Sequence, residues 1–212
     1  FMENCQQQYR ELIRQNINHP AIIFWISVNE VDPPHNFLPG PYFYAAFRQL
    51  SSEAHALDPS RPIAAAWREK FYPPADVTDV FGLNAYLGWY DRDFSDLESY
   101  IADHSKDGAK GKWAMTEYGA GASIYFHSEH PVRMDHSEEY QCLFHEQYWK
   151  VLSGHQEIWG KFVWNMFDFA VDSRKEGDHA GRNDKGLVTY DRQTRKDAFY
   201  FYKANWSQDP VM

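Results

Sequence analysis

The chain has 212 residues, of which 43% are hydrophobic and 17% aromatic, a composition typical of one globular domain with a sizeable core. Its formal net charge is −9 at pH 7, which argues against nucleic acid or an anionic membrane surface as a partner, because both would be repelled. The sequence has no continuous apolar run of about eighteen residues and no signal-like start, so no transmembrane segment is predicted and the first residues resemble the middle of a protein.

The two cysteines, Cys5 and Cys142, lie far apart in the sequence and do not have metal-ligand spacing. We therefore expect buried free thiols, with a disulfide as the alternative. Free thiols leave the compartment open between the cytoplasm and the periplasm or the extracellular space.

The chain begins with a predicted helix and a predicted buried strand. Apolar residues recur at helical spacing in residues 2–15, and the sequence "NINHP" ends this pattern. The apolar run 21–28 follows and leads directly to Asn29 and Glu30. A carboxylate at the end of an apolar strand must reach solvent or lie in a site, because burying it unpaired costs several kcal/mol. The helix face is expected to hold Cys5, Tyr9, Leu12 and Ile13.

A second helix and two more strands are predicted next. The helix ends at "DPSRP", and the apolar runs 62–67 and 79–86 are the predicted strands. The segment between these two runs is too short and too rich in proline for a full helix. The second run carries Asn84 and Tyr86 at its end. The helix face is expected to hold Phe43, Phe47, Leu50, Ala54 and Leu57.

The C-terminal half continues the alternation. A helix is predicted in "DLESYIADH", and the strand 112–118 then ends close after Glu117. Ser137 and the acidic residues after it predict the start of a helix that runs to Gly154. The run 160–168 is the fifth predicted strand, and "KDAFYFYKANW" predicts a closing helix. Between them, "AVDSRKEGDHAGRNDKG" is predicted to be a loop and "LVTYD" a short extended piece.

Apolar runs separated mostly by helices are typical of parallel strands buried on both faces, as in a doubly wound sheet or a (β/α)8 barrel. Four of the five runs end in polar or aromatic groups. Barrel enzymes take their working residues from the C-terminal ends of different strands. We therefore predict an α/β fold with five parallel strands in chain order, the first with an unpaired outer edge, and no second domain.

Glu30 and Glu117 occupy equivalent places, each at the end of an apolar strand. Two such carboxylates can divide the roles of acid and nucleophile between them. Cleavage of a glycosidic bond needs that division, and in the retaining mechanism the two carboxyl groups stand about 5 to 5.5 Å apart. The many aromatic residues fit this chemistry, because aromatic faces can hold a sugar ring.

Four motifs carry a resemblance to a known family: "NHPAIIFWISVNE", "TEYGAGAS", "GKFVWNMFDFA" and "NDKGLVTYDRQTRKDAFYFYKANW". Together they resemble glycoside hydrolase family 2, the family of β-galactosidases and β-glucuronidases. The resemblance covers residues 1–206, leaves 207–212 as a tail, and implies strands four to eight of a (β/α)8 (TIM) barrel. A full barrel takes about 250 residues. The chain is thus expected to be the C-terminal part of a catalytic domain whose N-terminal part is missing, and an oligomer is compatible with this.

The resemblance also implies roles for individual residues. It implies a retaining β-glycosidase that works by double displacement, with Glu30 as the acid/base and Glu117 as the nucleophile. Asn29 is expected to bind the sugar 2-hydroxyl, Tyr86 to neighbour the nucleophile and Trp164 to line the sugar subsite. No cofactor and no metal are expected. Carbohydrate is the expected partner.

Asn84, Asn183 and Lys185 complete the predicted substrate-binding residues. Asn183 and Lys185 in "NDKG" match an Asn-x-Lys pattern that contacts the substrate carboxylate in β-glucuronidases. By contrast, "TEYGAGAS" and "WNMFDFA" are more similar to the β-galactosidases of the family, in which "NDKGLV" stretches also occur. A β-galactosidase acting on terminal β-galactosides is therefore the favoured prediction. A β-glucuronidase or another β-glycosidase of the family is the alternative.

Two hypotheses of other classes stay open at this point. The chain could be an inactive fragment or a sugar-binding piece of a larger enzyme, and Val28 stands where the family commonly has glycine. A metal-dependent hydrolase that uses the same two glutamates is the other hypothesis. His127, His130 and His136 lie close in sequence, but they lack a matching set of carboxylates or cysteines and are predicted to be solvated loop histidines.

Overall fold

The computed structural model describes residues 1–31, 40–68, 76–106 and 113–208. By its internal contacts the chain divides into two compact units. The first consists of Phe1–Asn84 with Gly111–Thr116, and the second of Ala85–Lys110 with Glu117–Met212. The predicted strand 112–118 is thus shared, its last residues belonging to the second unit.

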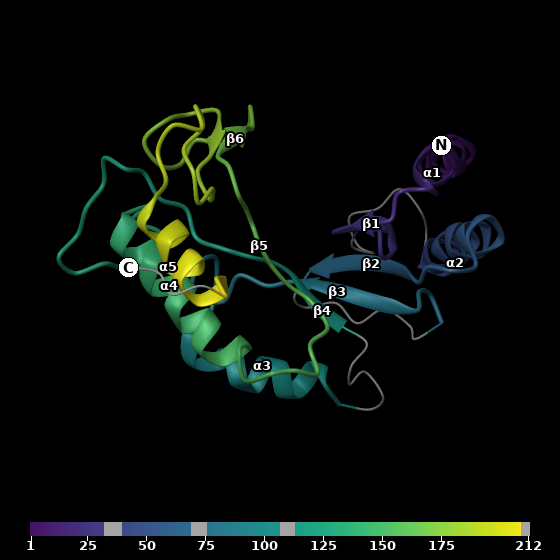
Figure 1. Ribbon diagram of the computed structural model, residues 1–212, viewed down its shortest axis with the longest axis horizontal. Coiled ribbons are helices and arrows are strands. Elements are labelled where there is room, and N and C mark those ends of the chain that lie inside the picture. The colour runs from purple at the N-terminus through teal and green to yellow at the C-terminus, as the bar shows by residue number, and fades with distance from the viewer. Residues whose placement is uncertain (32–39, 69–75, 107–112, 209–212) are drawn as a thin grey trace. The chain divides into compact units, whose positions relative to one another are not determined.

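Five strands form the main sheet in the chain order that the apolar runs predicted (Figure 1). β1 pairs with β2 and β2 with β3, both in parallel, with Trp25 opposite Ile63 and Ala64 opposite Val80. Within the described residues β1 is the edge strand, as expected. The parallel strands and intervening helices confirm the predicted part of a (β/α)8 barrel. The strands are β1 (Trp25–Asn29), β2 (Ile63–Arg68), β3 (Val80–Asn84), β4 (Trp113–Tyr118) and β5 (Lys161–Val163).

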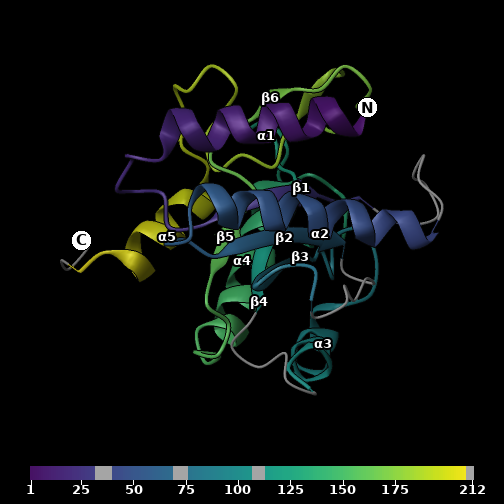
Figure 2. The same ribbon diagram turned by 90° about the vertical axis from the view of Figure 1, so that its right-hand side faces the viewer.

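Two helices, α1 (Met2–Asn16) and α2 (Gly40–Leu57), lie side by side in the first unit (Figure 2). Tyr9 and Ile13 of α1 are buried, whereas Leu12 is 47% exposed, so the buried face is narrower than predicted. Glu53 of α2 links the helices, because its carboxylate accepts hydrogen bonds from Gln6 at 2.9 Å and from the Arg10 guanidinium at 3.1 Å. On α2, Phe47, Leu50 and Ala54 are buried and Leu57 is half-buried, while the Phe43 side chain lies outside the described part.

The second unit contains α3 (Leu97–His104), α4 (Glu138–Leu152) and α5 (Asp197–Trp206), and α4 packs against both of the others. The Ser137 hydroxyl accepts a hydrogen bond from the Tyr140 N–H at 3.1 Å, which confirms the predicted helix start. Six apolar residues of α4 lie at helical spacing; Tyr140, Phe144, Tyr148 and Leu152 are buried, and Leu143 and Val151 are half-buried. His145 and Gln141 are buried as well, although both are polar and neither was predicted to be.

The last predicted strand differs from the structure. β5 ends at Val163, and residues 165–168 pair with residues 185–188 instead. For example, the Leu187 N–H donates to the Asn165 carbonyl at 3.0 Å. A small antiparallel pair, β6 (Phe169–Ala170) and β7 (Arg182–Asn183), forms where a loop was predicted over residues 170–186, with β6 beginning one residue before it. Strands of two residues are too short to produce a periodic pattern in the sequence.

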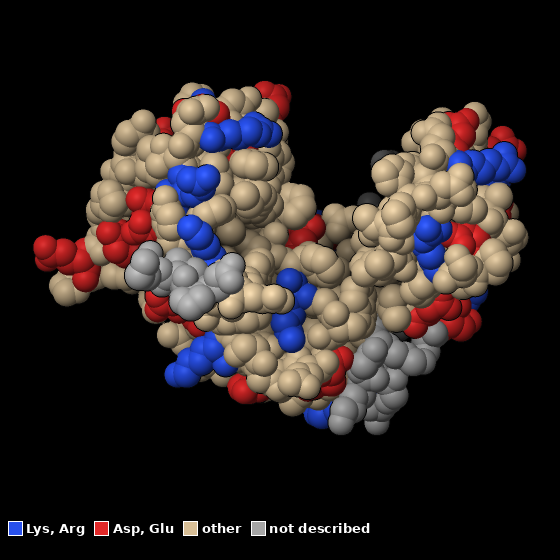
Figure 3. Space-filling model, in the orientation of Figure 1, with Lys and Arg blue, Asp and Glu red and all other residues tan. Residues whose placement is uncertain are grey.

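Charge on the described surface is mixed. Figure 3 shows basic and acidic groups interspersed on the visible face. Cys5 and Cys142 are free thiols, as predicted, but both are half-buried rather than buried. None of the helices in the described ranges combines the length and the apolar character needed to cross a membrane.

Candidate active site

Asn29, Glu30 and Asn84 form one hydrogen-bonded cluster in the first unit. The Asn84 side-chain amide donates to Asn29 Oδ1 at 3.0 Å and to Glu30 Oε1 at 2.9 Å. Glu30 follows the last residue of β1 with a left-handed φ of 51°, and its backbone N–H donates to the Ala66 carbonyl at 2.9 Å. The predicted acid/base and two predicted sugar-binding residues therefore meet at the C-terminal ends of β1 and β3.

The Asn84 amide is fixed from its other side by β4. Thr116 Oγ1 donates to Asn84 Oδ1 at 2.7 Å, and Asn84 is 2% exposed. Both ends of the amide are thus paired, which sets its orientation. Gly82 makes this contact possible, since a Cβ there would lie 2.2 Å from Thr116 Cγ2. Sequence reasoning did not place Thr116 among the site residues.

Arg68 is a further neighbour of Glu30 that the sequence analysis missed. Its Nε lies 3.5 Å from Glu30 Oε2, and its side chain is 56% exposed. Solvent screens an ion pair of this kind, so it adds little to stability. Arg68 could have been predicted from its position as the last residue of an apolar strand, because the other candidates were identified by the same position.

Glu117 of β4 has the neighbour that was predicted for the nucleophile. The Tyr86 hydroxyl donates to Glu117 Oε2 at 2.6 Å, and Tyr86 is 9% exposed. The hydroxyls next to Glu117 in the sequence have other partners: Thr116 donates to Asn84, and the Tyr118 hydroxyl accepts from Tyr202 at 3.1 Å. Side chains alternate between the two faces of a strand, so the neighbours of Glu117 face away from it.

Lys185 is a buried cation surrounded by aromatic rings. It is 1% exposed, and its ammonium donates to the Tyr90 hydroxyl at 2.7 Å. The ammonium lies 4.8 Å from the ring centre of Tyr90, 5.4 Å from that of Trp89 and 6.0 Å from that of Tyr86. The Lys185 backbone N–H donates to Asn183 Oδ1 at 3.0 Å. Among the described residues, Lys185 forms no ion pair with a carboxylate.

Trp89 and Tyr90 beside Lys185 were missed, although the sequence "LGWYD" directly after Tyr86 offered a signal. Tyr90 also accepts a hydrogen bond from Arg174 Nη1 at 2.9 Å, so two cations share one neutral phenol oxygen. Tyr90 and Tyr86 pack edge to face with ring centres 5.3 Å apart. This packing links the surroundings of Lys185 to those of Glu117.

Trp164 lies directly after β5. Its backbone N–H donates to the Tyr118 carbonyl at 2.9 Å, and its ring packs edge to face on Phe169 at 5.8 Å. Gly119 permits this close approach, because a Cβ there would lie 2.1 Å from the Trp164 carbonyl oxygen. The predicted sugar-lining ring is therefore anchored to the strand that carries Glu117.

Two of the three histidines considered for a metal site contact different carboxylates, and one of them, His136, is buried rather than solvated as predicted. His127 Nδ1 lies 2.9 Å from Glu139 Oε1, and the hydrogen bond with this carboxylate raises the pKa of His127. His136 is buried, with its Nδ1 2.6 Å from Asp184 Oδ2. Across the described ranges, no group of three or more His, Cys, Asp or Glu side chains is arranged to hold a metal ion.

Residues 1–208 match the family model described as "Glycosyl hydrolases family 2, TIM barrel domain". A β-glucuronidase of Bacteroides fragilis is 41% identical to the chain over 219 aligned positions, which cover 100% of the chain and 30% of that protein.

Two solved structures are also similar. A Bacteroides fragilis protein, assigned provisionally as a β-galactosidase, has 37% identity and a TM-score of 0.90 over 99% of the chain and 32% of that protein. A Bacteroides uniformis β-glucuronidase, described as covalently bound to cyclophellitol-6-carboxylate aziridine, has 31% identity and a TM-score of 0.89 over 99% of the chain and 26% of that protein. The chain thus spans about a third or less of the length of these relatives.

Proposed function

The chain belongs to glycosyl hydrolases family 2, and from that premise we propose that it is part of a retaining β-glycosidase that acts on β-glucuronides. The proposal rests on the two strand-end glutamates and on the buried Lys185. The sequence motifs favoured a β-galactosidase. The β-glucuronidase alternative has the better support, because β-glucuronidases of Bacteroides fragilis and Sus scrofa are among the similar proteins.

In the proposed first step, the ionised Glu117 carboxylate attacks the anomeric carbon and forms a glycosyl ester. Glu30 donates a proton to the departing oxygen as the bond to the aglycone breaks. In the second step Glu30, now ionised, removes a proton from water, and that water attacks the anomeric carbon and releases Glu117. Both steps invert the anomeric carbon, so the product retains the β configuration.

The neighbours of the two glutamates suit these roles. Tyr86 donates a charge-assisted hydrogen bond to the carboxylate that must be ionised to attack. Asn84 donates to both Asn29 and Glu30 and so fixes the acid/base beside the amide that is assigned to the sugar 2-hydroxyl. Bonds to that hydroxyl strengthen in the transition state, so Asn29 contributes to the rate rather than only to affinity.

The observation that supports a glucuronide substrate is that the buried Lys185 ammonium forms no ion pair with a carboxylate of the described residues. A buried ammonium needs partners, and its hydrogen bond goes to a neutral phenol, which leaves two N–H donors for an anion. The carboxylate at C6 of a glucuronide is such an anion, whereas a galactoside has a neutral hydroxymethyl group there. Asn183 orders the Lys185 backbone and offers its own amide group next to it.

The test compares an aryl β-glucuronide with the matching aryl β-glucoside, which differ only at C6, and adds the aryl β-galactoside. We expect the full-length protein to hydrolyse the glucuronide with the highest kcat/KM. Lys185→Met removes the charge at nearly constant side-chain length. It should lower kcat/KM for the glucuronide roughly 100-fold, the size of a lost charge-assisted hydrogen bond, and leave the glucoside within a few-fold.

The covalent step can be tested separately. The aziridine inhibitor bound by the Bacteroides uniformis relative should label Glu117, and mass spectrometry of peptides identifies the labelled residue. Labelling of Glu30 would exchange the proposed roles. Absence of both turnover and labelling in the full-length protein would favour the inactive or sugar-binding alternative. A preference for the galactoside would restore the β-galactosidase hypothesis.

A further inference from the structure

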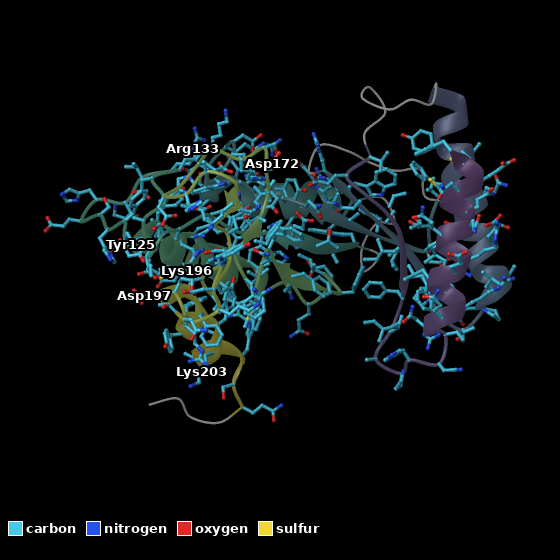
Figure 4. All side chains as sticks on the ribbon, turned by 90° about the horizontal axis from the view of Figure 1, so that it is seen from above. Tyr125, Arg133, Asp172, Lys196, Asp197 and Lys203 are labelled. Carbon is cyan, nitrogen blue, oxygen red and sulfur yellow. The ribbon has the colours of Figure 1, made fainter. Side chains whose placement is uncertain are left out.

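Lys196 is a fully buried cation that the proposed reaction does not use. It directly precedes α5, is 1% exposed, and lies inside the second unit (Figure 4). Its ammonium donates to the Ala122 carbonyl at 2.6 Å, to Asp168 Oδ1 at 2.8 Å and to the Asp184 carbonyl at 2.8 Å. An ammonium has three N–H donors, so this one is completely satisfied.

The three acceptors lie in segments of the second unit that carry Glu117, Trp164 and the Asn183–Lys185 pair. Ala122 follows Glu117 by five positions, and Asp168 follows Trp164 by four. Asp184 is the residue between Asn183 and Lys185, and its carbonyl also accepts the Ala122 N–H at 3.0 Å. One ammonium therefore joins the segments that follow β4 and β5 to the Asn183–Lys185 segment.

Asp168 connects Lys196 to the residue after Lys185. Its Oδ1 accepts both from Lys196 and from the Gly186 N–H at 2.8 Å. Gly186 has no room for a side chain, since a Cβ there would lie 2.2 Å from the Asp168 nitrogen. Burial raises the pKa of Asp168 to about 6, although the nearby charge of Lys196 opposes this effect. The Lys196 ammonium therefore helps to keep the Asp168 carboxyl group ionised.

Asp184 is held through its side chain as well. Burial raises the pKa of Asp184, but the hydrogen bond with His136 and the charges of His136, Lys196 and Lys185 outweigh burial, so the pKa lies below its usual value. Gly177 and Gly121 leave space for this carboxylate, because a Cβ on either would lie within 2.4 Å of it. The Asn183–Lys185 segment is therefore fixed at its centre by both the side chain and the carbonyl of Asp184.

We propose that Lys196 is a positioning residue that sets the place of Asn183 and Lys185 for the substrate carboxylate without touching the substrate. The role rests on the proposed glucuronide specificity. If the ammonium is removed, Asp168 loses its buried partner and the Asp184 carbonyl loses a donor, and both losses act next to Lys185. A displacement of about 1 Å at a substrate-binding group can cost about 100-fold in rate.

The test is Lys196→Met, which keeps the side-chain length and removes the three donors. We expect kcat/KM for the aryl β-glucuronide to fall roughly 100-fold and that for the aryl β-glucoside to fall less than about 5-fold. Hydrogen exchange of the Lys185 and Gly186 amides should accelerate at least about 10-fold. The matched control is Lys203→Met on α5, an exposed lysine labelled in Figure 4, which should change neither quantity.

Equal losses for both substrates, or no loss, would overturn the positioning role. If Lys196→Met does not fold, Asp168→Asn replaces it, because the amide keeps the shape but not the charge that pairs with Lys196. A loss confined to the glucuronide supports the role, and a uniform loss contradicts it. If the wild-type protein cleaves neither substrate, the proposed function fails, and the exchange rates of Lys185 and Gly186 alone decide the role of Lys196.

Discussion

At the residue scale, the two candidate catalytic glutamates differ in what donates to them. Glu30 receives a hydrogen bond from the Asn84 amide, and Glu117 receives one from the Tyr86 phenol. These two donors are neutral, and the cation near Glu30, Arg68, is 56% exposed and screened by solvent. The assignment of roles therefore follows from the family resemblance and from the neighbouring residues. The assignment can be tested by chemical rescue.

Azide should separate the two roles in the full-length protein. Glu30→Ala removes the acid/base but leaves the nucleophile, so an aryl glycoside with a good leaving group can still form the glycosyl-enzyme. Azide needs no general base to attack this intermediate and should yield a glycosyl azide of β configuration. The product is identified by its anomeric proton coupling in NMR spectra.

The complementary variant, Glu117→Ala, tests the role of the other glutamate. Glu117→Ala leaves a cavity in which azide replaces the nucleophile and attacks the substrate once, so the expected product is the inverted α-azide. A β-azide from Glu117→Ala would show that Glu30 is the nucleophile instead. Glu146→Ala, an exposed glutamate on α4, serves as the control that should need no rescue.

At the element scale, neighbouring strands place site residues by fitting closely together. Gly82 of β3 lies against Thr116 of β4, and Thr116 in turn holds the Asn84 amide. The contact shows why a strand interior contains glycine here, although glycine weakens strands elsewhere. A side chain at position 82 would displace Thr116 and so weaken its hydrogen bond to Asn84.

Gly82→Ala should therefore impair both stability and activity. The added Cβ forces Thr116 to move, which we expect to cost about 1–3 kcal/mol of unfolding free energy and to break the bond from Thr116 to Asn84. Urea unfolding and kcat/KM measure the two effects. Thr116→Ala combined with Gly82→Ala should recover part of the stability but not the activity, and additive losses in stability would contradict the contact.

α4 contains a buried histidine, His145, that should make the free energy of unfolding depend on pH. Burial lowers the pKa of His145 to about 3, and its Nδ1 lies 2.9 Å from the Tyr202 hydroxyl. Between about pH 3 and pH 6.5 the unfolded chain binds a proton that folded His145 does not, so the unfolding free energy rises with pH there. This contribution is fully present above about pH 6.5 and is lost as the pH falls.

His145→Gln should remove that pH dependence. At pH 5 the wild-type protein should have lost about 2 kcal/mol relative to pH 8 through this group, and the variant should not. The comparison uses hydrogen exchange of α4 amides at both pH values. Asp168 acts in the opposite direction between about pH 4 and 6, but it is present in both proteins and cancels in the difference. An unchanged pH dependence in the variant would contradict a neutral buried His145.

The sequence predicted the five main strands from their apolar runs and most helices from the spacing of their apolar residues. It could not predict β6 and β7, which have two residues each, or the early end of β5. Apolar spacing also placed Leu12 on a buried face, although 47% of it is exposed. Amphipathic spacing identifies a face but not which of its edges another element covers.

For the candidate site, strand ends located Glu30, Glu117 and Asn84, because position along a strand is visible in the sequence. Thr116 and Lys196 were missed, because their importance depends on which distant atoms they bond. No local pattern distinguishes a lysine that bonds three separate segments from a lysine on a helix surface. Contacts of this kind become visible only in three dimensions.

At the scale of the whole molecule, the relatives are more than three times as long as the chain. β1 is the edge strand within the described residues, and Ile23 and Ile26 near it are 65% and 43% exposed. An apolar strand edge of this kind calls for a covering segment. A (β/α)8 barrel has three strands before those assigned here, and in the proposed enzyme they would supply that cover and the rest of the sugar-binding wall.

In the proposed mechanism, Glu30 and Glu117 of the full-length protein act on one anomeric carbon. The retaining mechanism requires the carboxyl groups of Glu30 and Glu117 to stand about 5 to 5.5 Å apart, because one of them must reach the carbon directly. An experimental structure of the full-length protein measures this separation. NMR of the first product formed gives an independent result, and β-glucuronic acid should appear before mutarotation. A separation of about 9 Å together with an α product would instead mean that a water molecule lies between carboxylate and sugar, and that the enzyme inverts.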